Sequence, residues 1–169
     1  VERRLIEQTY VDLQRVGDTP QGHALRRYWK GHYLPALPDS AIEALLAHDS
    51  SMGASLQTHG GAIADVPADA TAFGHRGTAF EYMGAARWND SAEDANRMAS
   101  VRECARRIEP FARGAYVNAL GDDGESGVGR AYPAAVLARL TALKDAVDPE
   151  NVFHLNQNIQ PSRRVSTVL

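Results

Sequence analysis

The chain has 169 residues, of which 44% are hydrophobic and 23% are charged, a composition typical of a globular protein with a hydrophobic core. Its net charge of −3 gives no electrostatic reason to bind nucleic acid or an anionic membrane, and no apolar run is long enough to span a bilayer. The single cysteine, Cys104, excludes an internal disulfide framework and a thiolate metal cluster. With no signal-peptide pattern at its start, the sequence favours a cytoplasmic location.

Strands dominate the prediction for the first half of the chain. Aromatic residues predict a strand at 28–34, and a capping-box pattern at the start of 40–48 predicts a short helix. Side chains alternate again over 52–66, where the pair Gly60-Gly61 is typical of a β-bulge or a close backbone approach.

The middle of the chain predicts two more strands and a helix. Residues 71–75 indicate a short strand, and 78–88 a longer one because apolar and polar side chains alternate along it. From Ser91 a capping pattern leads into apolar residues at helical spacing, and the helix ends before Pro110.

The last third begins with a predicted strand at 114–120 and an acidic, glycine-rich loop at 121–130. A helix follows, with Pro133 in its first turn and a hard stop at Asp148-Pro149. Its predicted buried face consists of Val136, Leu137, Leu140, Leu143 and Val147.

These elements together predict an α+β fold. Strands in runs, helices between them and no βαβ alternation favour an antiparallel sheet covered by helices, followed by a C-terminal helix and an extended tail. The glycine-rich loop is the only boundary signal, so we expect one domain at 1–120 and a second segment at 121–169.

Tyr116 and Asn118 are the first candidates for a functional site. An ordinary phenol, with a pKa of about 10, acts as a base at neutral pH only if its anion is stabilised. In a strand, Asn118 shares a face with Tyr116 and offers an amide donor and acceptor. The structural alternatives are a tyrosine packed at a strand edge and an asparagine at a strand end.

Two histidines could suggest a metal-binding site, but the sequence does not support one. His59 and His75 lie on different predicted strands, and no acidic residue completes a ligand spacing, so ordinary hydrogen-bonded histidines are expected. Tyr82 lies among alternating aromatic residues, which more often belong to a core than to a cavity wall.

Separated motifs, in order over about residues 20–161, resemble the berberine-bridge-enzyme-like, FAD-linked oxidoreductases. The motifs are Tyr28-Trp29-Lys30, His59-Gly60-Gly61-Ala62, Thr71-Ala72-Phe73-Gly74-His75-Arg76, Tyr116-Val117-Asn118, Asp148-Pro149-Glu150-Asn151-Val152-Phe153 and Leu155-Asn156-Gln157-Asn158-Ile159.

The resemblance implies oxidation of a small-molecule alcohol or amine by hydride transfer to FAD, with dioxygen as the acceptor. The residue roles that it implies are Tyr116 as the base, Asn118, Asn156 and Asn158 as flavin contacts, and His59, His75, Arg76 and Tyr82 as substrate-cavity residues. Some members of the family use a glutamate on a different strand as the base.

The motifs that hold the FAD phosphates are absent from this sequence, which has no GxGxxG after a strand and no Walker-type loop. The resemblance places them in an N-terminal domain. We therefore expect the C-terminal half of such an enzyme, inactive alone, with a missing FAD domain as its partner. The alternative is a non-catalytic ligand-binding or oligomerisation module, whose exposed apolar face leads to self-association.

Overall fold

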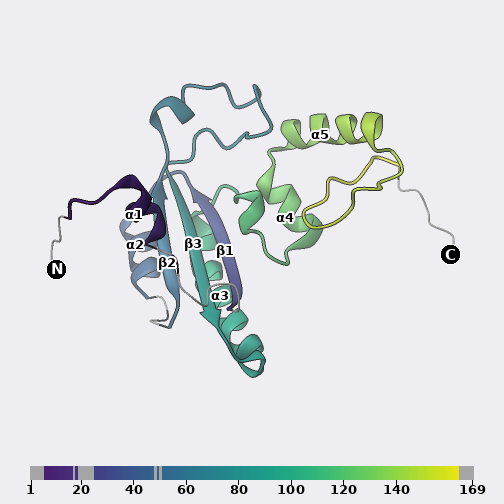
Figure 1. Ribbon diagram of the computed structural model, residues 1–169. Coiled ribbons are helices and arrows are strands. Elements are labelled where there is room, and N and C mark those ends of the chain that lie inside the picture. The colour runs from purple at the N-terminus through teal and green to yellow at the C-terminus, as the bar shows by residue number, and fades with distance from the viewer. Residues whose placement is uncertain (1–5, 17, 19–24, 48, 50, 164–169) are drawn as a thin grey trace.

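An antiparallel sheet of three strands, in the order β1-β3-β2, forms the centre of the computed structural model (Figure 1). Its strands are β1 (Arg26–Leu34), β2 (Gly53–Thr58) and β3 (Phe80–Trp88). The structure describes residues 6–16, 18, 25–47, 49 and 51–163.

Helices pack on one face of this sheet, and the end of the chain lies to one side of it (Figure 1). The α-helices of the described residues are α1 (Tyr10–Arg15), α2 (Asp39–Leu46), α3 (Asp94–Ile108), α4 (Gly124–Ala131) and α5 (Ala134–Val147). The 3-10 turns are η1 (Gly61–Ile63), η2 (Ser91–Glu93), η3 (Glu109–Phe111) and η4 (Val117–Ala119). Helix α3 contacts β1 and β3, and α2 contacts α3. The α+β fold class is therefore confirmed.

The core lies between the sheet and α3. Its two clusters are Tyr28, Met52, Ala86, Trp88, Val101 and Cys104 in one, and Leu34, Tyr82 and Ile108 in the other. Alternation along β3 buries every second residue from Tyr82 to Trp88, as the strand prediction requires. The intervening residues, beginning with Glu81, belong to the opposite face.

The prediction for 114–130 is wrong. The expected strand at 114–120 is the 3-10 turn η4, closed by a hydrogen bond from the Ala119 amide to the Tyr116 carbonyl (2.8 Å). The expected loop at 121–130 contains α4, which begins at the positive-φ Gly124, three residues after the positive-φ Gly121. The glycine content of this stretch led to the prediction of a loop, although the helix buries Val128 and Ala131 at helical spacing.

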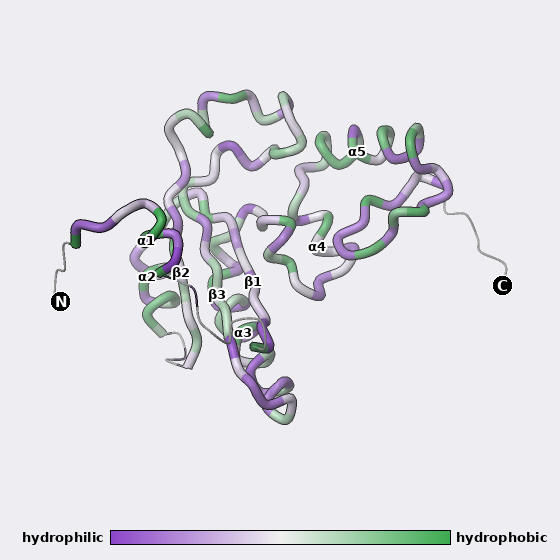
Figure 2. The backbone as a smooth tube through the Cα atoms, viewed as in Figure 1, coloured by the Kyte–Doolittle hydropathy of each residue, from purple (hydrophilic) through white to green (hydrophobic). Residues whose placement is uncertain are grey.

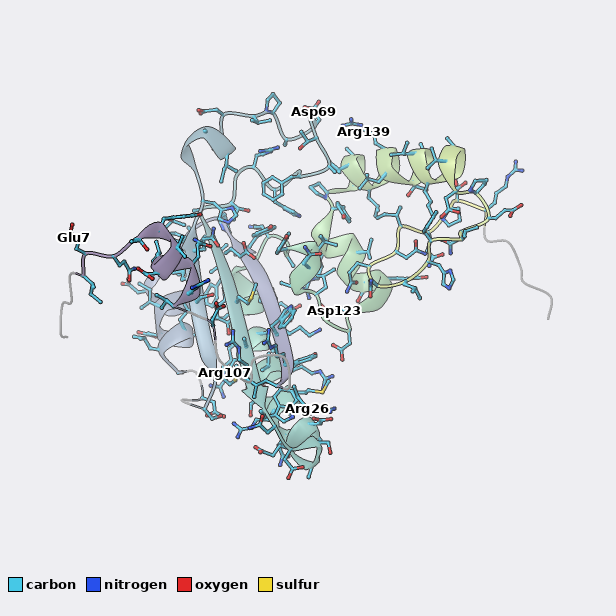
Figure 3. The ribbon with its side chains drawn as sticks, viewed as in Figure 1. Glu7, Arg26, Asp69, Arg107, Asp123 and Arg139 are labelled. Carbon is cyan, nitrogen blue, oxygen red and sulfur yellow. The ribbon has the colours of Figure 1, made fainter. Side chains whose placement is uncertain are left out.

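Residues 71–75 form a bent loop rather than the predicted strand. The Arg76 guanidinium holds this loop by donating to the Phe73 carbonyl (3.0 Å), the Ile63 carbonyl (3.3 Å) and Thr71 Oγ1 (2.8 Å). Arg139 of α5 donates to the Asp69 carbonyl and ties the loop to that helix (Figure 3).

The predicted strand at 52–66 is also too long. Strand β2 ends at Thr58, because Gly60 and Gly61 adopt φ values of 128° and 53° and lead into η1. The glycine pair therefore ends the strand instead of forming a bulge within it.

Two capping predictions are wrong as well. Helix α2 is preceded by Pro38, which provides no side-chain cap, and Ser40 lies inside the helix. The cap predicted at Ser91 is supplied by Asp90, whose carboxylate accepts a hydrogen bond from the Ala92 amide (2.9 Å).

Helix α5 exposes apolar residues that the sequence predicts to be buried. Val136 is buried, but Leu143 and Val147 are 56% and 71% exposed. Figure 2 shows that hydrophobic residues continue along this helix into the tail. The apolar stripe exists, but the described residues of this chain do not cover it.

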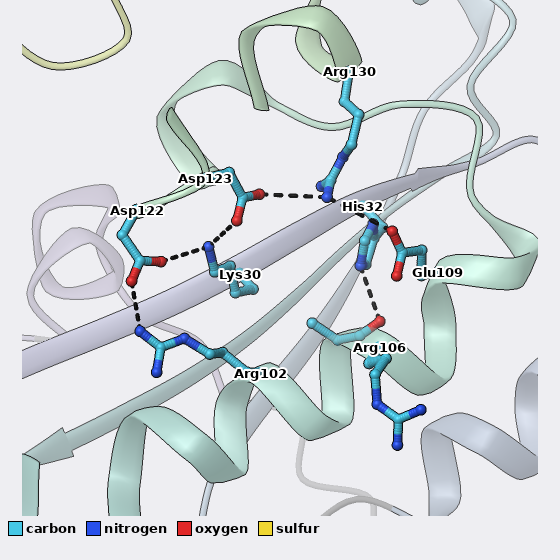
Figure 4. Close-up of a pocket in the computed structure, with 9 residues that line it drawn as sticks. Lys30, His32, Arg102, Arg106, Glu109, Asp122, Asp123 and Arg130 are labelled. Atoms are coloured by element: carbon cyan, nitrogen blue, oxygen red, sulfur yellow. Dashed lines mark hydrogen bonds and ion pairs between the residues drawn. The ribbon is translucent and has the colours of Figure 1, made fainter. Parts of the chain in front are cut away.

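A buried lysine fastens the segment after η4 to the free edge of β1 (Figure 4). The Lys30 ammonium donates to the Leu120 carbonyl (2.6 Å), to Asp122 Oδ1 (2.8 Å) and to Asp123. Before η4, the Gly114 carbonyl accepts a hydrogen bond from the amide of Tyr33 (2.9 Å). Residues 114–123 therefore run alongside β1.

We expect Leu34→Ala to lower the free energy of unfolding by about 2–5 kcal/mol, because it leaves a cavity in the core. Leu34 is fully buried against Tyr82 and Ile108. Urea denaturation measures the change, and Leu46→Ala, at a position that is 76% exposed, is the matched control. Equal stability of the two variants would contradict the assigned core.

The Asp122 cluster predicts an acid-sensitive contribution to stability. Hydrogen bonds from Lys30, Tyr28 and Arg102 hold the pKa of the Asp122 carboxyl well below its usual range. The pKa of Asp122 is lower in the folded chain than in the unfolded chain, where it is about 3.9. The ionised carboxylate therefore stabilises the fold at pH values above about 3.9, and this stabilisation is lost as the pH falls through the pKa of the folded chain.

Urea denaturation at a series of pH values tests this contribution. We expect the stability difference between the unsubstituted protein and Asp122→Asn to shrink as the pH falls below about 4. The exposed Asp65→Asn serves as the control and should match the unsubstituted protein throughout. A difference for Asp122→Asn that stays constant with pH would rule out this role.

Candidate functional site

The face of the sheet opposite α3 carries a row of polar side chains. Tyr33, Glu81 and Gln57 are direct neighbours across β1, β3 and β2. Leu34 and Tyr82, the next residues along their strands, point into the core, so Tyr33 and Glu81 point to the other side. We refer to this side as the uncovered face of the sheet because α3 packs on the other side, although the loop that carries His59, Phe73 and His75 covers it at Tyr33.

A close contact joins His59 to this row. Its Nε2 lies 3.3 Å from Glu81 Oε2, and the two side chains are only 10% and 12% exposed. The other ring nitrogen of His59, Nδ1, is buried and has no hydrogen-bond partner among the described residues. The pair is therefore a largely desolvated acid–base couple beside the end of β2.

Tyr33 lies at the centre of the cluster. It is 2% exposed, and its ring contacts His59, His75 and Phe73 at centroid distances of 5.7, 5.3 and 6.0 Å. Burial, with smaller contributions from Glu81 and Tyr116, raises the pKa of Tyr33 far above its ordinary value. The phenol thus remains a hydrogen-bond donor at neutral pH, and both Glu81 and Tyr116 lie close enough to act on it.

Tyr116 and Asn118 are brought together, although not by a strand. Asn118 Nδ2 donates to the Tyr116 hydroxyl (2.7 Å), and the Asn118 carbonyl accepts from Trp29 Nε1 (3.0 Å). Turn η4 lies directly on β1 at Gly31, where an added Cβ would be 2.7 Å from the Cβ of Ala119.

Beside this turn is a cavity of about 200 Å³ with a mainly apolar and aromatic lining. Its lining residues are Tyr33, Ala72, Phe73, Ala115, Tyr116, Val117, Ala131 and Tyr132. Tyr116 is 38% exposed at this cavity, so its hydroxyl is accessible to a small molecule. The cavity and the polar row share Tyr33.

The remaining predicted cavity residues occupy three different environments. His75 contacts Tyr33, and its Nε2 lies 3.1 Å from the Arg130 carbonyl; burial lowers its pKa. Arg76 holds the 61–76 loop through the hydrogen bonds described above. Tyr82 is 1% exposed and packs in the core, so it does not point to the uncovered face.

The amides of the tail are not joined to Tyr116 by any hydrogen bond of the described residues. Asn158 Nδ2 donates to Asn151 Oδ1 (3.0 Å), and Asn156 is exposed with a φ of 58°. Gln157, between them, donates to the Gly121 carbonyl (2.9 Å), while its Oε1 is buried without a partner. The tail therefore folds back on the turn that follows η4.

Sequence reasoning missed Glu81 and Tyr33 as members of the site. The signal was available, because Glu81 falls on the second face of a strand whose first face is apolar.

Over the described residues, no group of three or more His, Cys, Asp or Glu side chains is placed to hold a metal ion. No described helix is long and apolar enough to cross a membrane.

Comparison with known proteins links this arrangement to one family. Residues 115–160 match the family model described as "Berberine and berberine like". The chain is 39% identical over 104 residues to the uncharacterized FAD-linked oxidoreductase YvdP of Bacillus subtilis, and 30% identical over 148 residues to berberine bridge enzyme-like 6 of Arabidopsis thaliana. These alignments cover 62% and 75% of this chain, but 23% and 27% of those proteins.

A solved structure supports the fold. BBE-like #28 from Arabidopsis thaliana matches 83% of this chain and 34% of its own, with a TM-score of 0.71 at 23% identity. The chain thus spans about a quarter of the length of the curated relatives that it matches. Its resemblance to the berberine-bridge-enzyme-like, FAD-linked oxidoreductases is confirmed.

Proposed function

We propose that this chain forms the substrate side of the active site of an FAD-dependent oxidoreductase that oxidises an alcohol or amine carbon of a small molecule. One observation carries the proposal: Tyr33 and Tyr116 line one cavity, and Tyr33 is the direct cross-strand neighbour of Glu81. Acid and base groups gathered at an apolar cavity are typical of a site of proton transfer.

Tyr116 is the first candidate for the base that takes the substrate proton. Asn118 donates a hydrogen bond to its phenol oxygen, and such a bond strengthens when the oxygen becomes negative. The neutral phenol of Tyr33 remains a donor that can orient a substrate oxygen. His75 supports this position by contact with the Tyr33 ring.

Glu81 is the second candidate base. A carboxylate can accept a proton directly, whereas a tyrosine phenol must first lose its own proton. His59 contacts Glu81 and holds it in place. In this arrangement His59 is a positioning residue. The two candidates predict different effects of substitution, which the experiment below separates.

FAD, when bound, supplies the two-electron acceptor, with dioxygen proposed as the final oxidant. The amides of Asn118, Asn156 and Asn158 have the donors and acceptors that the polar edge of a flavin ring requires, and we propose that they face it. Its phosphates need a cradle of backbone amides or cations. Since the sequence has no glycine-rich phosphate motif, we propose that another part of the protein holds them.

The apolar surface of α5 and the tail is the proposed docking face for that part. Its exposed residues are Leu143, Val147, Val152, Phe153 and Leu155. A groove of about 520 Å³ lies along the tail, and its surface is mainly apolar. In this proposal residues 1–120 bear the substrate side, and 121–169 pack on the FAD-binding part.

The two candidate bases are tested in the full-length, flavin-loaded protein. The base should lower the rate of flavin reduction by about 10²–10⁴-fold when replaced isosterically, by Tyr116→Phe or by Glu81→Gln, with flavin absorbance retained. Stopped-flow absorbance measures the rate. Tyr10→Phe, on the exposed helix α1, is the control. If neither substitution slows reduction, another group takes the substrate proton and both assignments are wrong.

The docking face is tested with the 169-residue chain and the FAD-binding part as separate polypeptides. We expect the chain alone to retain no flavin on gel filtration, and the mixture to elute as one yellow complex. Phe153→Asp should abolish that complex because it places a charge in an apolar contact, whereas Ile6→Asp should not. Flavin retained by the chain alone would overturn the proposal, and self-association without the partner would favour the homo-oligomer alternative.

A further inference from the structure

A second cavity lies on the α3 side of the sheet, away from the proposed active site (Figure 4). His32 lines it, whereas the next residue, Tyr33, belongs to the uncovered face; consecutive residues of a strand point to opposite sides. Its volume is about 320 Å³. The lining residues are Lys30, His32, Arg102, Ala105, Arg106, Glu109, Asp122, Asp123 and Arg130.

His32 presents an unpaired acceptor at this cavity. The residue is 3% exposed, and its Nε2 lies 3.0 Å from the Ala105 carbonyl, which can only accept, so Nε2 carries the hydrogen. The ring is also stacked on Tyr82, with 14° between the planes. Nδ1 therefore has a fixed lone pair, and it is buried without a hydrogen-bond partner among the described residues. Burial and the charge of Arg130 lower the pKa of His32 to about 4, which keeps the ring neutral at pH 7.

The cations around the cavity differ in how firmly they are paired. Lys30 is held by three oxygens, and Arg102 donates to Asp122 Oδ2 (2.5 Å). Within the part of the chain that the structure describes, Arg130 has only long ion pairs, 3.4 Å to Asp123 and 4.0 Å to Glu109. Its guanidinium thus has donors available to an additional anionic oxygen.

Arg106 adds a cation at the rim of the cavity. Its side chain is 70% exposed and pairs with Glu103 of the same helix, a solvated contact that an incoming anion can replace. The lining residues include four cationic and three anionic side chains, so their charge balance favours a small anion over a cation.

We propose that this cavity binds a small oxyanion that also carries a hydroxyl group, such as a hydrogen phosphate or a 2-hydroxycarboxylate. The hydroxyl donates to His32 Nδ1, and the anionic oxygens accept from Arg130 and Arg106. The cavity volume is at the lower end of the range for small-molecule sites, which suits a ligand of this size.

The first test compares ligands by isothermal titration calorimetry at pH 7. Inorganic phosphate and glycolate both carry the hydroxyl; sulfate and acetate are their matched controls without it. We expect phosphate or glycolate to bind one-to-one and at least about tenfold more tightly than its control. The reason is that a ligand with a hydroxyl donates a hydrogen bond to the buried His32 Nδ1, whereas its control cannot. The tighter of the two identifies the ligand class. Equal affinity for each pair, or no saturable binding at all, would overturn the proposal.

The second test locates the site. Binding should shift the ¹⁵N resonance of His32 Nδ1 in the unsubstituted protein, a readout that requires no variant. Arg130→Gln should weaken binding about tenfold or more through loss of a charge-assisted hydrogen bond, whereas Arg113→Gln, an exposed arginine outside the cavity lining, should not. An unshifted His32 resonance, or an unchanged affinity for Arg130→Gln, would place the ligand elsewhere.

Discussion

The buried ammonium of Lys30 and the oxygens around it determine how the two halves of the chain fit together. A lysine on the core side of β1 is unfavourable unless its charge is paired and its donors are satisfied. The Leu120 carbonyl and the carboxylates of Asp122 and Asp123 meet that requirement, and they can do so only if the segment after η4 lies along the edge of β1. The same placement sets η4 on Gly31 and Tyr116 beside the uncovered face. Pairing one buried charge thus positions the candidate base.

Strand β1 serves both faces of the sheet because its side chains alternate. Lys30 and His32 belong to the α3 side, and Tyr33 to the uncovered side. The proposed anion cavity and the proposed active site are therefore separated by only the thickness of the sheet. They differ in character: the first is lined mainly by charged groups, whereas the second is mainly apolar and aromatic, with its acid–base residues at one side.

Sequence reasoning succeeded where a side-chain pattern determines the structure and failed where backbone conformation does. Aromatic content predicted β1 and alternation predicted β3, and the family resemblance placed Tyr116 and Asn118 in one motif, which the structure brings into contact. The region 114–130 was mispredicted because positive-φ glycines there start a helix instead of a loop. Tyr82 and Glu81 are adjacent on β3, and the alternation of that strand already separates its two faces. That His59 and His75 gather beside Tyr33 and Glu81 depends on tertiary packing, which no local pattern contains.

The exposed end of the chain is ordered in a way that argues for a binding surface. Asp148 accepts hydrogen bonds from the amides of Val152 (2.8 Å) and Phe153 (3.1 Å) and from Lys144 (2.5 Å), so the turn after α5 is held by its own polar groups. That turn nevertheless leaves the Phe153 side chain 81% exposed. A backbone already held by its own hydrogen bonds loses little further entropy when a partner covers the apolar side chain that it carries. The turn thus suits the proposed docking face, and the contact of Gln157 with Gly121 links it to the segment that carries Tyr116. A partner bound at the tail would in this way rest on the same segment that Lys30 holds against the sheet.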